Sequence, residues 1–468
     1  MTDISALKAN LDGIKVEDDP RIVRKKSRDF FWYSPILKEQ LDAVTGDLLV
    51  SPKNVDEVIR VLKVCYAADI PVTARGAGTG NYGQAMPLSG GVVLDLSEMD
   101  AVKDIKPSVV VTEPGAVMAD IDAQTIPRTG HALRIHPSTY RIATIGGFLA
   151  GGAAGVGSVN WGGLRDLGNV IRLRMVTMEA EPQVLELTGS DVQKAIHAYG
   201  TTGIITEIEV PLTEAYDWID VLVGFDDFIN AIRFSEELAN MDGLLTKNIA
   251  TIEAPLPHDY FLRHKKFIRK EQSVVVLMVA AFAMGALDGL LSRSPGAEML
   301  YRSDSATAED ITHLPPAYEL TWNHTTLRGL SVDPSITYLQ VRYPDVKPLE
   351  TIGKLQSIFA EELPGHLEFI RYNGGLVPIG LPIVRFTDKT RLDEIIKRHE
   401  ALGCTIFNPH RYTLEEGGMK QIDPVLLAFK RQTDPKGLLN PGKMIAWEHP
   451  DYKFDSDQGF LFPGLQRS

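Results

Sequence analysis

Segment 408–420 carries a dense series of polar and aromatic side chains directly after an apolar run. If the strand predicted for that run continues, its period of two places Asn408, His410 and Tyr412 on one face. An imidazole beside a phenol and an amide can move a proton and hydrogen-bond a small molecule, so we predict His410 as a general base. The alternative, a capped loop histidine beside a packing tyrosine, stays open. The predicted catalytic set is His410, Tyr412, Asn408, Arg411 and Glu416.

Segment 322–325, with the sequence Trp-Asn-His-Thr, is a second polar set that could line a pocket, and an ordinary hydrogen-bonded loop is the alternative. An anionic substrate would need local arginines, because the formal net charge of the chain is −13. Bidentate hydrogen bonds from Arg371, Arg385 or Arg411, together with Tyr372, can clamp a carboxylate. Each of these arginines alone is more typical of a surface ion pair.

Glycines 76, 78, 80 and 83 form a flexible loop in which the last three have the G-x-G-x-x-G spacing of nicotinamide-binding folds. That interpretation requires a helix directly after the loop. Here the loop leads through Pro87 and two further glycines into the apolar strand predicted at 91–96, and no Gly-Lys-Ser/Thr follows that would mark a P-loop. Successive N–H groups of such a loop can still converge on a diphosphate. A set of tight turns is the alternative.

The elements around this loop follow from periodicity. Segment 54–70 has apolar residues at helical spacing, with Asn54 and Glu57 placed as a capping box, and 70–74 reads as a strand. A second glycine cluster spans 144–163 and precedes a strand near 170–178. Segment 200–207 leads into another strand that ends near Leu212, where we place a domain boundary.

Beyond that boundary, strand-like runs such as 335–341 and 381–386 alternate with amphipathic helices such as 387–402, which Gly403 ends. The apolar run 274–287 is shorter than the roughly 20 residues of a spanning helix and reads as a buried strand followed by a turn or helix start. We predict a first domain at 1–212, an α+β domain with an antiparallel sheet at 213–421, and a C-terminal segment at 422–468.

Composition narrows the class of protein. The chain has 468 residues, 44% of them hydrophobic, which suits two globular domains. Its negative charge argues against nucleic-acid binding, and two cysteines, Cys65 and Cys404, exclude a disulfide framework. No secretion pattern begins the chain, so we expect a cytoplasmic protein without an integral membrane span. A homo-oligomer is compatible with these features.

The ordered series of motifs resembles the vanillyl-alcohol oxidase and p-cresol methylhydroxylase superfamily, and within it the branch of the glycolate oxidase D-subunit and D-lactate dehydrogenase. The motifs are 71–85, 137–139, 144–147, 200–207 and 434–443. This resemblance implies a two-part FAD-binding domain of the p-cresol methylhydroxylase type and an α+β cap over the flavin. The implied cofactor-binding residues are Arg75, Gly76, Gly78, Thr79, Gly80, Asn81, Gly83, Pro137, Ser138, Thr139, Thr144, Gly146, Gly147, Gly151, Gly155, Ile204, Ile205, Asn440 and Lys443.

The resemblance also implies an activity: FAD-dependent oxidation of a small hydroxylated substrate, a 2-hydroxy acid or another alcohol, by hydride transfer to flavin. A flavin-binding electron-transfer subunit of a larger oxidase complex is the alternative. Some relatives attach the flavin to a histidine in the first loop, where this chain has Thr79-Gly80-Asn81, so we expect non-covalent FAD. Oxygen, a quinone and a flavoprotein all stay open as electron acceptor.

The sequence departs from the branch at its metal-binding motifs. Where relatives have Glu-His-Gly, this chain reads Glu415-Glu416-Gly417, and 365–368 keeps only one histidine of the other motif. One histidine does not make a metal site, so we predict none from these motifs. A phenolic, cyclic or sugar-like alcohol therefore joins the 2-hydroxy acids as a candidate substrate.

Overall fold

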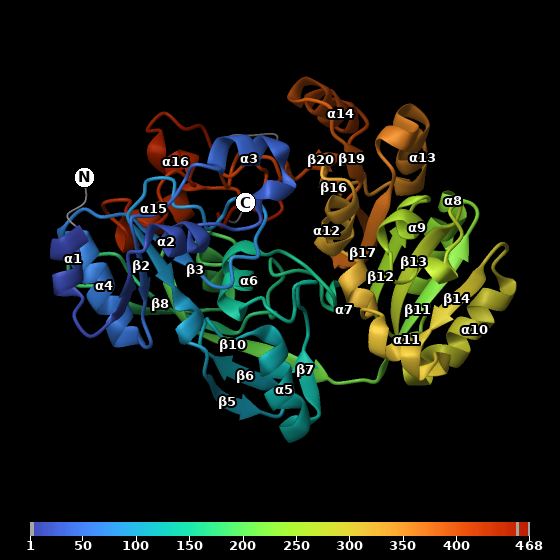
Figure 1. Ribbon diagram of the computed structural model, residues 1–468, viewed down its shortest axis with the longest axis horizontal. Helices are drawn as coiled ribbons and strands as arrows, with labels where there is room; N and C mark the ends of the chain where they lie inside the picture. The colour runs from blue at the N-terminus through green and yellow to red at the C-terminus, as the bar shows by residue number, and fades with distance from the viewer. Residues whose placement is uncertain (1–3, 455–457, 467–468) are drawn as a thin grey trace.

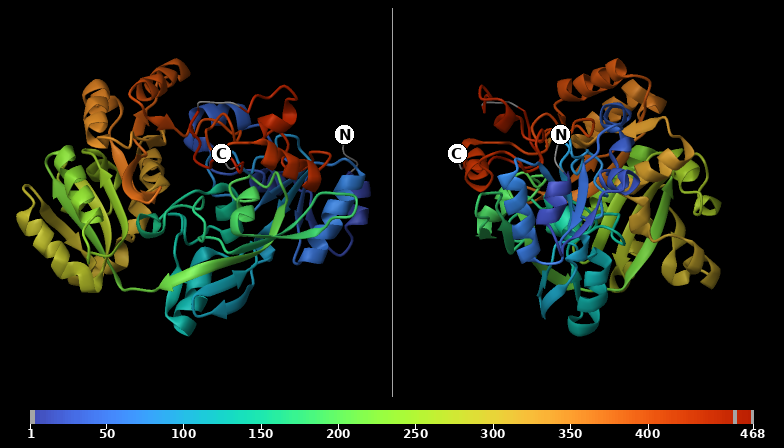
Figure 2. Two further views of the ribbon diagram at one scale, coloured as in Figure 1. Left: turned by 180° about the vertical axis from the view of Figure 1, so that it is seen from behind. Right: turned by 60° about the vertical axis from the view of Figure 1, so that its left-hand side comes forward.

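The computed structural model describes residues 4–454 and 458–466, which form two lobes lying side by side (Figure 1). One lobe combines the N-terminal part of the chain with its C-terminal segment, and the other is built from the residues between them. Figure 2 shows the C-terminal segment, in red, packed back against the blue N-terminal elements. Within the described ranges, every helix falls short of the length and apolar character that crossing a membrane requires.

The first sheet presents the glycine loop. Strands β2 (Leu48–Ser51), β4 (Val92–Asp95) and β3 (Val72–Arg75) pair in parallel, and β1 (Lys15–Glu17) joins β2 antiparallel. Helix α4 (Val55–Ala67) connects β2 to β3, and its cap is as predicted: Asn54 Oδ1 accepts from the Glu57 N–H at 2.9 Å. The chain then runs from β3 through the glycines into β4 without a helix, which confirms the argument against a nicotinamide-type loop.

The second sheet is antiparallel and lies beside the first. Its strand order is β5 (Val102–Lys106), β6 (Val109–Thr112), β10 (Ile204–Glu214), β8 (Arg172–Val176) and β9 (Val184–Thr188), and β7 (His131–Leu133) pairs with the far end of β10. The predicted strands at 170–178 and after 203 are thus present. Helices α5 (Met118–Thr129), α6 (Ile145–Gly151) and α7 (Ser158–Trp161) connect these strands.

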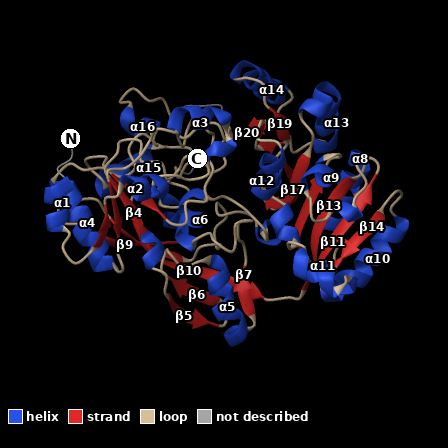
Figure 3. Cartoon of the chain, in the orientation of Figure 1, coloured by secondary structure: helices blue, strands red, loops and turns tan. Residues whose placement is uncertain are grey.

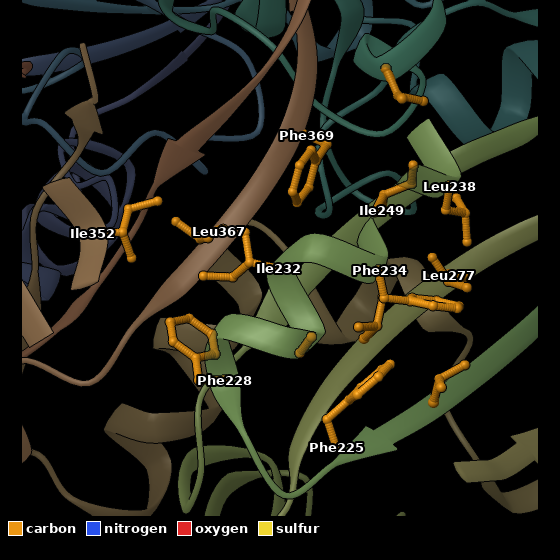
Figure 4. Close-up of a cluster of buried hydrophobic side chains, with 14 of the residues drawn as sticks. Phe225, Phe228, Ile232, Phe234, Leu238, Ile249, Leu277, Ile352, Leu367 and Phe369 are labelled. Atoms are coloured by element: carbon orange, nitrogen blue, oxygen red, sulfur yellow. The ribbon is translucent and has the colours of Figure 1, made fainter. Parts of the chain in front are cut away.

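The other lobe is an antiparallel sheet with helices on both faces. Its order is β14 (Glu298–Arg302), β11 (Trp218–Phe225), β13 (Ser273–Ala280), β12 (Thr246–Ile252), β17 (His366–Tyr372), β18 (Gly375–Gly380), β16 (Val341–Arg342) and β20 (Thr405–Ile406). Alternate residues of β13 join two different cores. Leu277 packs with Phe234 of α8 (Phe228–Ala239) in the core of Figure 4, whereas Val276 packs on the face toward the first lobe. The run 274–287 is therefore a buried strand that leads into α10 (Met284–Arg293), as predicted.

Figure 3 shows further helices, in blue, joined by long loops, in tan. They are α1 (Ile4–Asn10), α2 (Pro20–Lys26), α3 (Pro35–Leu41), α9 (Leu256–Tyr260), α11 (Ala308–His313), α12 (Asn323–Val332), α13 (Pro348–Phe359), α14 (Lys389–Ala401), α15 (Pro424–Thr433) and α16 (Ile445–Glu448). Helix α14 matches the predicted helix, with Asp388 as its N-cap and Gly403 at φ 82° after its end. The strand-like run 335–341 forms β15 (Ile336–Tyr338) and the start of β16, and 381–386 forms β19 (Ile383–Arg385).

The strand predicted to continue through 408–412 is wrong. Strand β20 ends at Ile406. The Asn408 side chain then accepts a hydrogen bond from the His410 N–H at 2.9 Å, while the Asn408 N–H donates to the Gly417 carbonyl. An asparagine that bonds to the backbone two residues ahead makes a turn, so Asn408, His410 and Tyr412 do not share a strand face.

The C-terminal segment returns to the first sheet. The Val72 N–H donates to the Leu438 carbonyl at 2.8 Å, and the Asn440 N–H donates to the Val72 carbonyl at 2.9 Å. The Asn440 side-chain amide then donates to the carbonyls of Gln84 and Tyr199, each at 2.8 Å. This residue ties the tail to the end of the glycine loop and to the turn before β10.

Candidate active site

One large cavity lies between the two lobes, and the two glycine clusters form much of its wall. Most of the predicted cofactor-binding residues line it: Arg75, Gly76, Gly78, Thr79, Gly80, Asn81, Pro137, Ser138, Thr139, Thr144, Gly146, Gly147, Gly151, Ile204 and Ile205. Four predicted residues are not part of the lining: Gly83, Gly155, Asn440 and Lys443. The cap contributes the opposite wall.

Arg75 holds carbonyl groups at the start of the glycine loop. The buried guanidinium donates to the carbonyls of Gly76 at 3.2 Å, Ala77 at 3.0 Å and Arg28 at 3.1 Å. Within the described parts of the chain, the N–H groups of residues 77–81 donate no hydrogen bond. Consecutive unbonded N–H groups along one cavity wall are a site for an anion.

The two glycine clusters touch at Gly76. A Cβ atom placed on Gly76 would lie 1.9 Å from Thr144 Oγ1, which itself caps α6 by accepting from the Gly147 N–H at 3.3 Å. Gly78 has φ +71°, and a Cβ there would lie 2.1 Å from an Arg75 nitrogen. Both glycines are therefore required by close packing and backbone conformation, and the two clusters form one continuous surface.

The four predicted cofactor residues outside the lining pack against neighbouring backbone and side chains instead. A Cβ on Gly83 would lie 2.6 Å from Leu41, and one on Gly155 would lie 2.2 Å from the His136 carbonyl. Lys443 Nζ donates to the Gly83 carbonyl at 2.6 Å. Burial lowers the pKa of Lys443 to about 7, and Asp29 is its charged neighbour.

The cap wall carries the polar set at 322–325. Trp322, Asn323 and His324 line the cavity at the start of α12. Trp322 has φ 53°, and its N–H donates to Glu368 Oε1 at 2.6 Å, while the same oxygen bonds His366 Nε2 at 2.9 Å. This buried pair fixes the turn that presents Asn323 and His324 to the cavity.

His324 is suited to accept a proton. Burial, and then the nearby Arg328, lower its pKa to about 4, so the imidazole is neutral at pH 7. Its ring has no hydrogen-bond partner in the described protein. The side-chain oxygen of the adjacent Asn323 is likewise buried without a partner.

Arg342 provides positive charge on the same wall. Its Nη2 donates to both carboxylate oxygens of Asp345, at 2.8 and 2.7 Å, but its buried Nε has no partner among the described residues. The guanidinium lies 4.9 Å from the ring centre of Tyr372, and that of Arg165 lies 4.4 Å from the same centre. Of the arginines proposed from sequence, Arg371 and Arg385 are exposed and donate to the carbonyls of Gly374 and Glu361.

The predicted catalytic set lies outside the cavity lining. His410 is buried, with Nδ1 2.7 Å from Ser34 Oγ and Nε2 3.0 Å from the Tyr338 carbonyl, and burial lowers its pKa to about 4. Asn408 bonds the His410 N–H, and the Tyr412 ring packs under Lys443. Glu416 is exposed and accepts from Thr413. Arg411 is half-buried beside them. Because both nitrogens of His410 are bonded within the protein, these contacts favour a structural part for it.

The cavity residues Arg342, His197 and Tyr199 were not among those predicted from the sequence. For His197 and Tyr199, the sequence signal is their place shortly before Gly200. Across the described ranges, no cluster of three or more histidine, cysteine, aspartate or glutamate side chains is arranged to hold a metal ion.

Residues 46–186 match the family model of the FAD binding domain. A glycolate oxidase subunit of Bacillus subtilis is 28% identical over 439 residues, covering 86% of this chain and 89% of that protein. A D-lactate dehydrogenase of Anaerostipes hadrus is 32% identical over 181 residues, 36% of this chain and 37% of the relative. An alkyldihydroxyacetonephosphate synthase structure has a TM-score of 0.72 at 15% identity, covering 94% of this chain and 85% of its own, which shows the fold.

Fold, cavity and relatives agree on a class: the chain is a flavoprotein oxidoreductase with FAD as its cofactor. The FAD-binding motif series recognised in the sequence agrees with this family model and with the similarity to the glycolate oxidase subunit and the D-lactate dehydrogenase.

Proposed function

We propose that this protein oxidises a small 2-hydroxy acid, with FAD bound across the two glycine clusters and the substrate under the cap. The observation that carries the proposal is the composition of the two cavity walls. One wall offers the unbonded N–H groups of residues 77–81, and the other offers His324 and Arg342. The similar proteins named for glycolate and D-lactate act on 2-hydroxy acids, which supports this substrate class.

The cofactor fits the residues present. The N–H groups of 77–81 would hold the diphosphate, and 137–139 and 204–205 would line the rest of the nucleotide. We propose residues 1–212 and 422–468 as the FAD domain and 213–421 as the cap. The loop has Thr79-Gly80-Asn81 rather than a histidine, so the FAD is proposed to be non-covalent.

The protein groups divide the chemistry between them. When bound, the flavin supplies the hydride acceptor. Arg342 Nε and its charge would fix the substrate carboxylate, and this orients the α-carbon. His324, neutral at pH 7, would accept the hydroxyl proton as the C–H bond breaks. The buried Glu368 and His366 pair holds the Trp322 turn and so positions His324.

The competing proposal is an electron-transfer subunit, because the Bacillus subtilis relative is itself named as a subunit. A carrier needs no base or anion site over its flavin. The neutral imidazole and the partly unbonded guanidinium on the cap wall therefore favour an enzyme.

The test is anaerobic reduction of the bound flavin, followed by its visible absorbance. We expect 2-hydroxy acids such as glycolate or D-lactate to bleach the flavin, and their neutral amides and phenolic alcohols to react far more slowly. Bleaching by phenolic or sugar alcohols but by no 2-hydroxy acid would overturn the substrate class. Flavin that none of these compounds reduces would support the electron-transfer subunit.

A further inference from the structure

His197 and Tyr199 place two unpartnered polar atoms at the cavity. His197 Nε2 and the Tyr199 hydroxyl are buried without a hydrogen-bond partner in the described protein, although both residues line the cavity. Their side chains belong to residues that are 0% and 4% exposed. Burying such atoms without a hydrogen-bond partner is unfavourable, and a bound ligand can offset that cost.

The orientation of both rings is fixed. His197 Nδ1 lies 2.7 Å from the Gly152 carbonyl, an acceptor only, so the ring proton sits on Nδ1 and Nε2 is left as an acceptor. The imidazole stacks on Phe462, with ring centres 4.5 Å apart. The Tyr199 ring lies 5.2 Å from the imidazole and carries a hydroxyl that can donate.

The backbone holds this arrangement in an unfavourable conformation. His197 has φ 47° and Tyr199 φ 53°, in the left-handed region that residues with a Cβ rarely adopt. Two hydrogen bonds of 2.9 Å maintain it, from the His197 N–H to the Leu149 carbonyl and from the Tyr199 N–H to the Ala150 carbonyl. Strain of this kind concentrates where side chains must be aimed at a ligand.

The pair lies between the end of α6 and the C-terminal segment, where His197 stacks on Phe462 and Tyr199 packs with Leu414 and Met444. Burial first, and then the neighbouring Tyr82 hydroxyl, raise the pKa of Tyr199. The Tyr82 hydroxyl in turn accepts a hydrogen bond from Gln340, a cavity residue of the cap. Leu461, the residue before Phe462, also lines the cavity and packs on the cap core. Tyr82, directly after the N–H groups of residues 77–81, therefore links the Tyr199 hydroxyl to both the glycine loop and Gln340 of the cap.

We propose that His197 and Tyr199 bind the pyrimidine half of the flavin ring, with His197 Nε2 accepting from the ring N–H and the Tyr199 hydroxyl donating to an adjacent ring carbonyl. The other half of the ring system is a dimethylbenzene with no polar atoms to match them. The inference rests on FAD binding and is independent of the substrate.

The first test uses Tyr199→Phe, which removes only the hydroxyl, with Tyr66→Phe outside the cavity as the matched control. The full-length apoprotein is titrated with FAD, FMN and ADP. FMN keeps the flavin ring and ADP keeps the adenine half. Loss of one hydrogen bond weakens FAD and FMN binding by about two- to tenfold and leaves ADP binding unchanged. Weaker ADP binding with unchanged FMN binding, or no change in any ligand, would overturn the proposal.

The second test is the midpoint potential of the bound flavin. A hydroxyl that donates to a ring carbonyl stabilises the reduced, more electron-rich ring, so its removal in Tyr199→Phe lowers the potential relative to wild type and Tyr66→Phe. A potential equal to that of the wild type would contradict the contact. Thermal unfolding of each variant shows that the fold is retained. If Tyr199→Phe leaves the flavin potential unchanged while a 2-hydroxy acid still reduces the flavin, then this contact is refuted and the proposed activity is not.

Discussion

At the scale of single residues, we assign a catalytic role to His324 and a structural role to His410. Both imidazoles have a pKa lowered to about 4, with burial as the main cause. His410 has both nitrogens bonded within the protein, whereas His324 lines the cavity. We predict that His324→Gln slows flavin reduction by roughly 10²- to 10⁴-fold, the range of a general base, with FAD still bound. Stopped-flow absorbance measures this rate.

His410→Gln is the control for that substitution. It removes a buried imidazole of the same acidity that lies outside the cavity lining, so it should lower thermal stability and leave the reduction rate near that of the wild type. If flavin reduction were slow in His410→Gln and fast in His324→Gln, His410 would be the general base, as the sequence suggested.

The acidity of His324 sets a pH dependence. The base must be neutral, and its pKa of about 4 lies below the ordinary value of 6.5, so the active form dominates above about pH 5. Flavin reduction should be independent of pH between 6 and 8 and should fall about tenfold per unit below pH 4. A rate that already falls between pH 8 and 6 would contradict a buried neutral imidazole.

Arg342 should determine charge selectivity. Arg342→Gln removes a charged donor, and charged hydrogen bonds contribute about 1.5–3 kcal/mol, so KM for a 2-hydroxy acid should rise roughly ten- to 100-fold. KM for the neutral amide of the same acid should hardly change. Arg371→Gln, exposed and outside the cavity, is the matched control. Equal effects of Arg342→Gln on acid and amide would remove Arg342 from carboxylate binding.

At the scale of elements, the glycine loop and α6 form one surface through Gly76. Gly76→Ala places a methyl group 1.9 Å from Thr144 Oγ1 and should separate the two clusters, so the purified variant should contain little FAD. Gly285→Ala is the control, because a Cβ there meets no atom within 4 Å. The flavin absorbance per protein measures both. Full FAD content in Gly76→Ala would reject the shared surface.

Elements with strong local signals could be predicted from the sequence. The α4 cap at Asn54, the buried strand β13 and the passage from β3 into β4 all follow from periodicity and capping. Helix α6 was not predicted. It begins with Ile145 followed by the adjacent Gly146 and Gly147, and glycines weaken the local helix preference. Its packing against Gly76 is a tertiary contact that no local pattern shows.

Among the site residues, too, those with a local sequence signal could be predicted and those placed by tertiary contacts could not. Glycines that need close approach carry a recognisable spacing, so the sequence marks the loop as a candidate anion site, and the loop lines the cavity. Two polar segments, 322–325 and 408–420, are candidates for the catalytic wall, and only the packing of the cap over the loop decides which of them faces the cavity. Arg342 follows the short strand-like run predicted at 335–341, and the sequence alone does not mark it as different from exposed arginines.

At the scale of the whole molecule, the chain leaves the first lobe after β10 and returns to it with residues 438–440 beside β3. FAD bound between these parts should stabilise the native state only. Free FAD at 100 times its Kd adds about 2.7 kcal/mol to the free energy of unfolding, so excess FAD should raise the Tm of the apoprotein. ADP, which lacks the flavin, should raise it less. Differential scanning fluorimetry checks this, and a Tm insensitive to FAD would contradict the cavity as its site.

The central claim, that the flavin lies in the cavity with its ring beneath the cap, is tested most directly by a crystal structure of the FAD-loaded protein. We predict density for the diphosphate on the N–H groups of residues 77–81 and for the ring system between that wall and His324. Density for FAD elsewhere, or a ring that points away from the cap, would contradict the account.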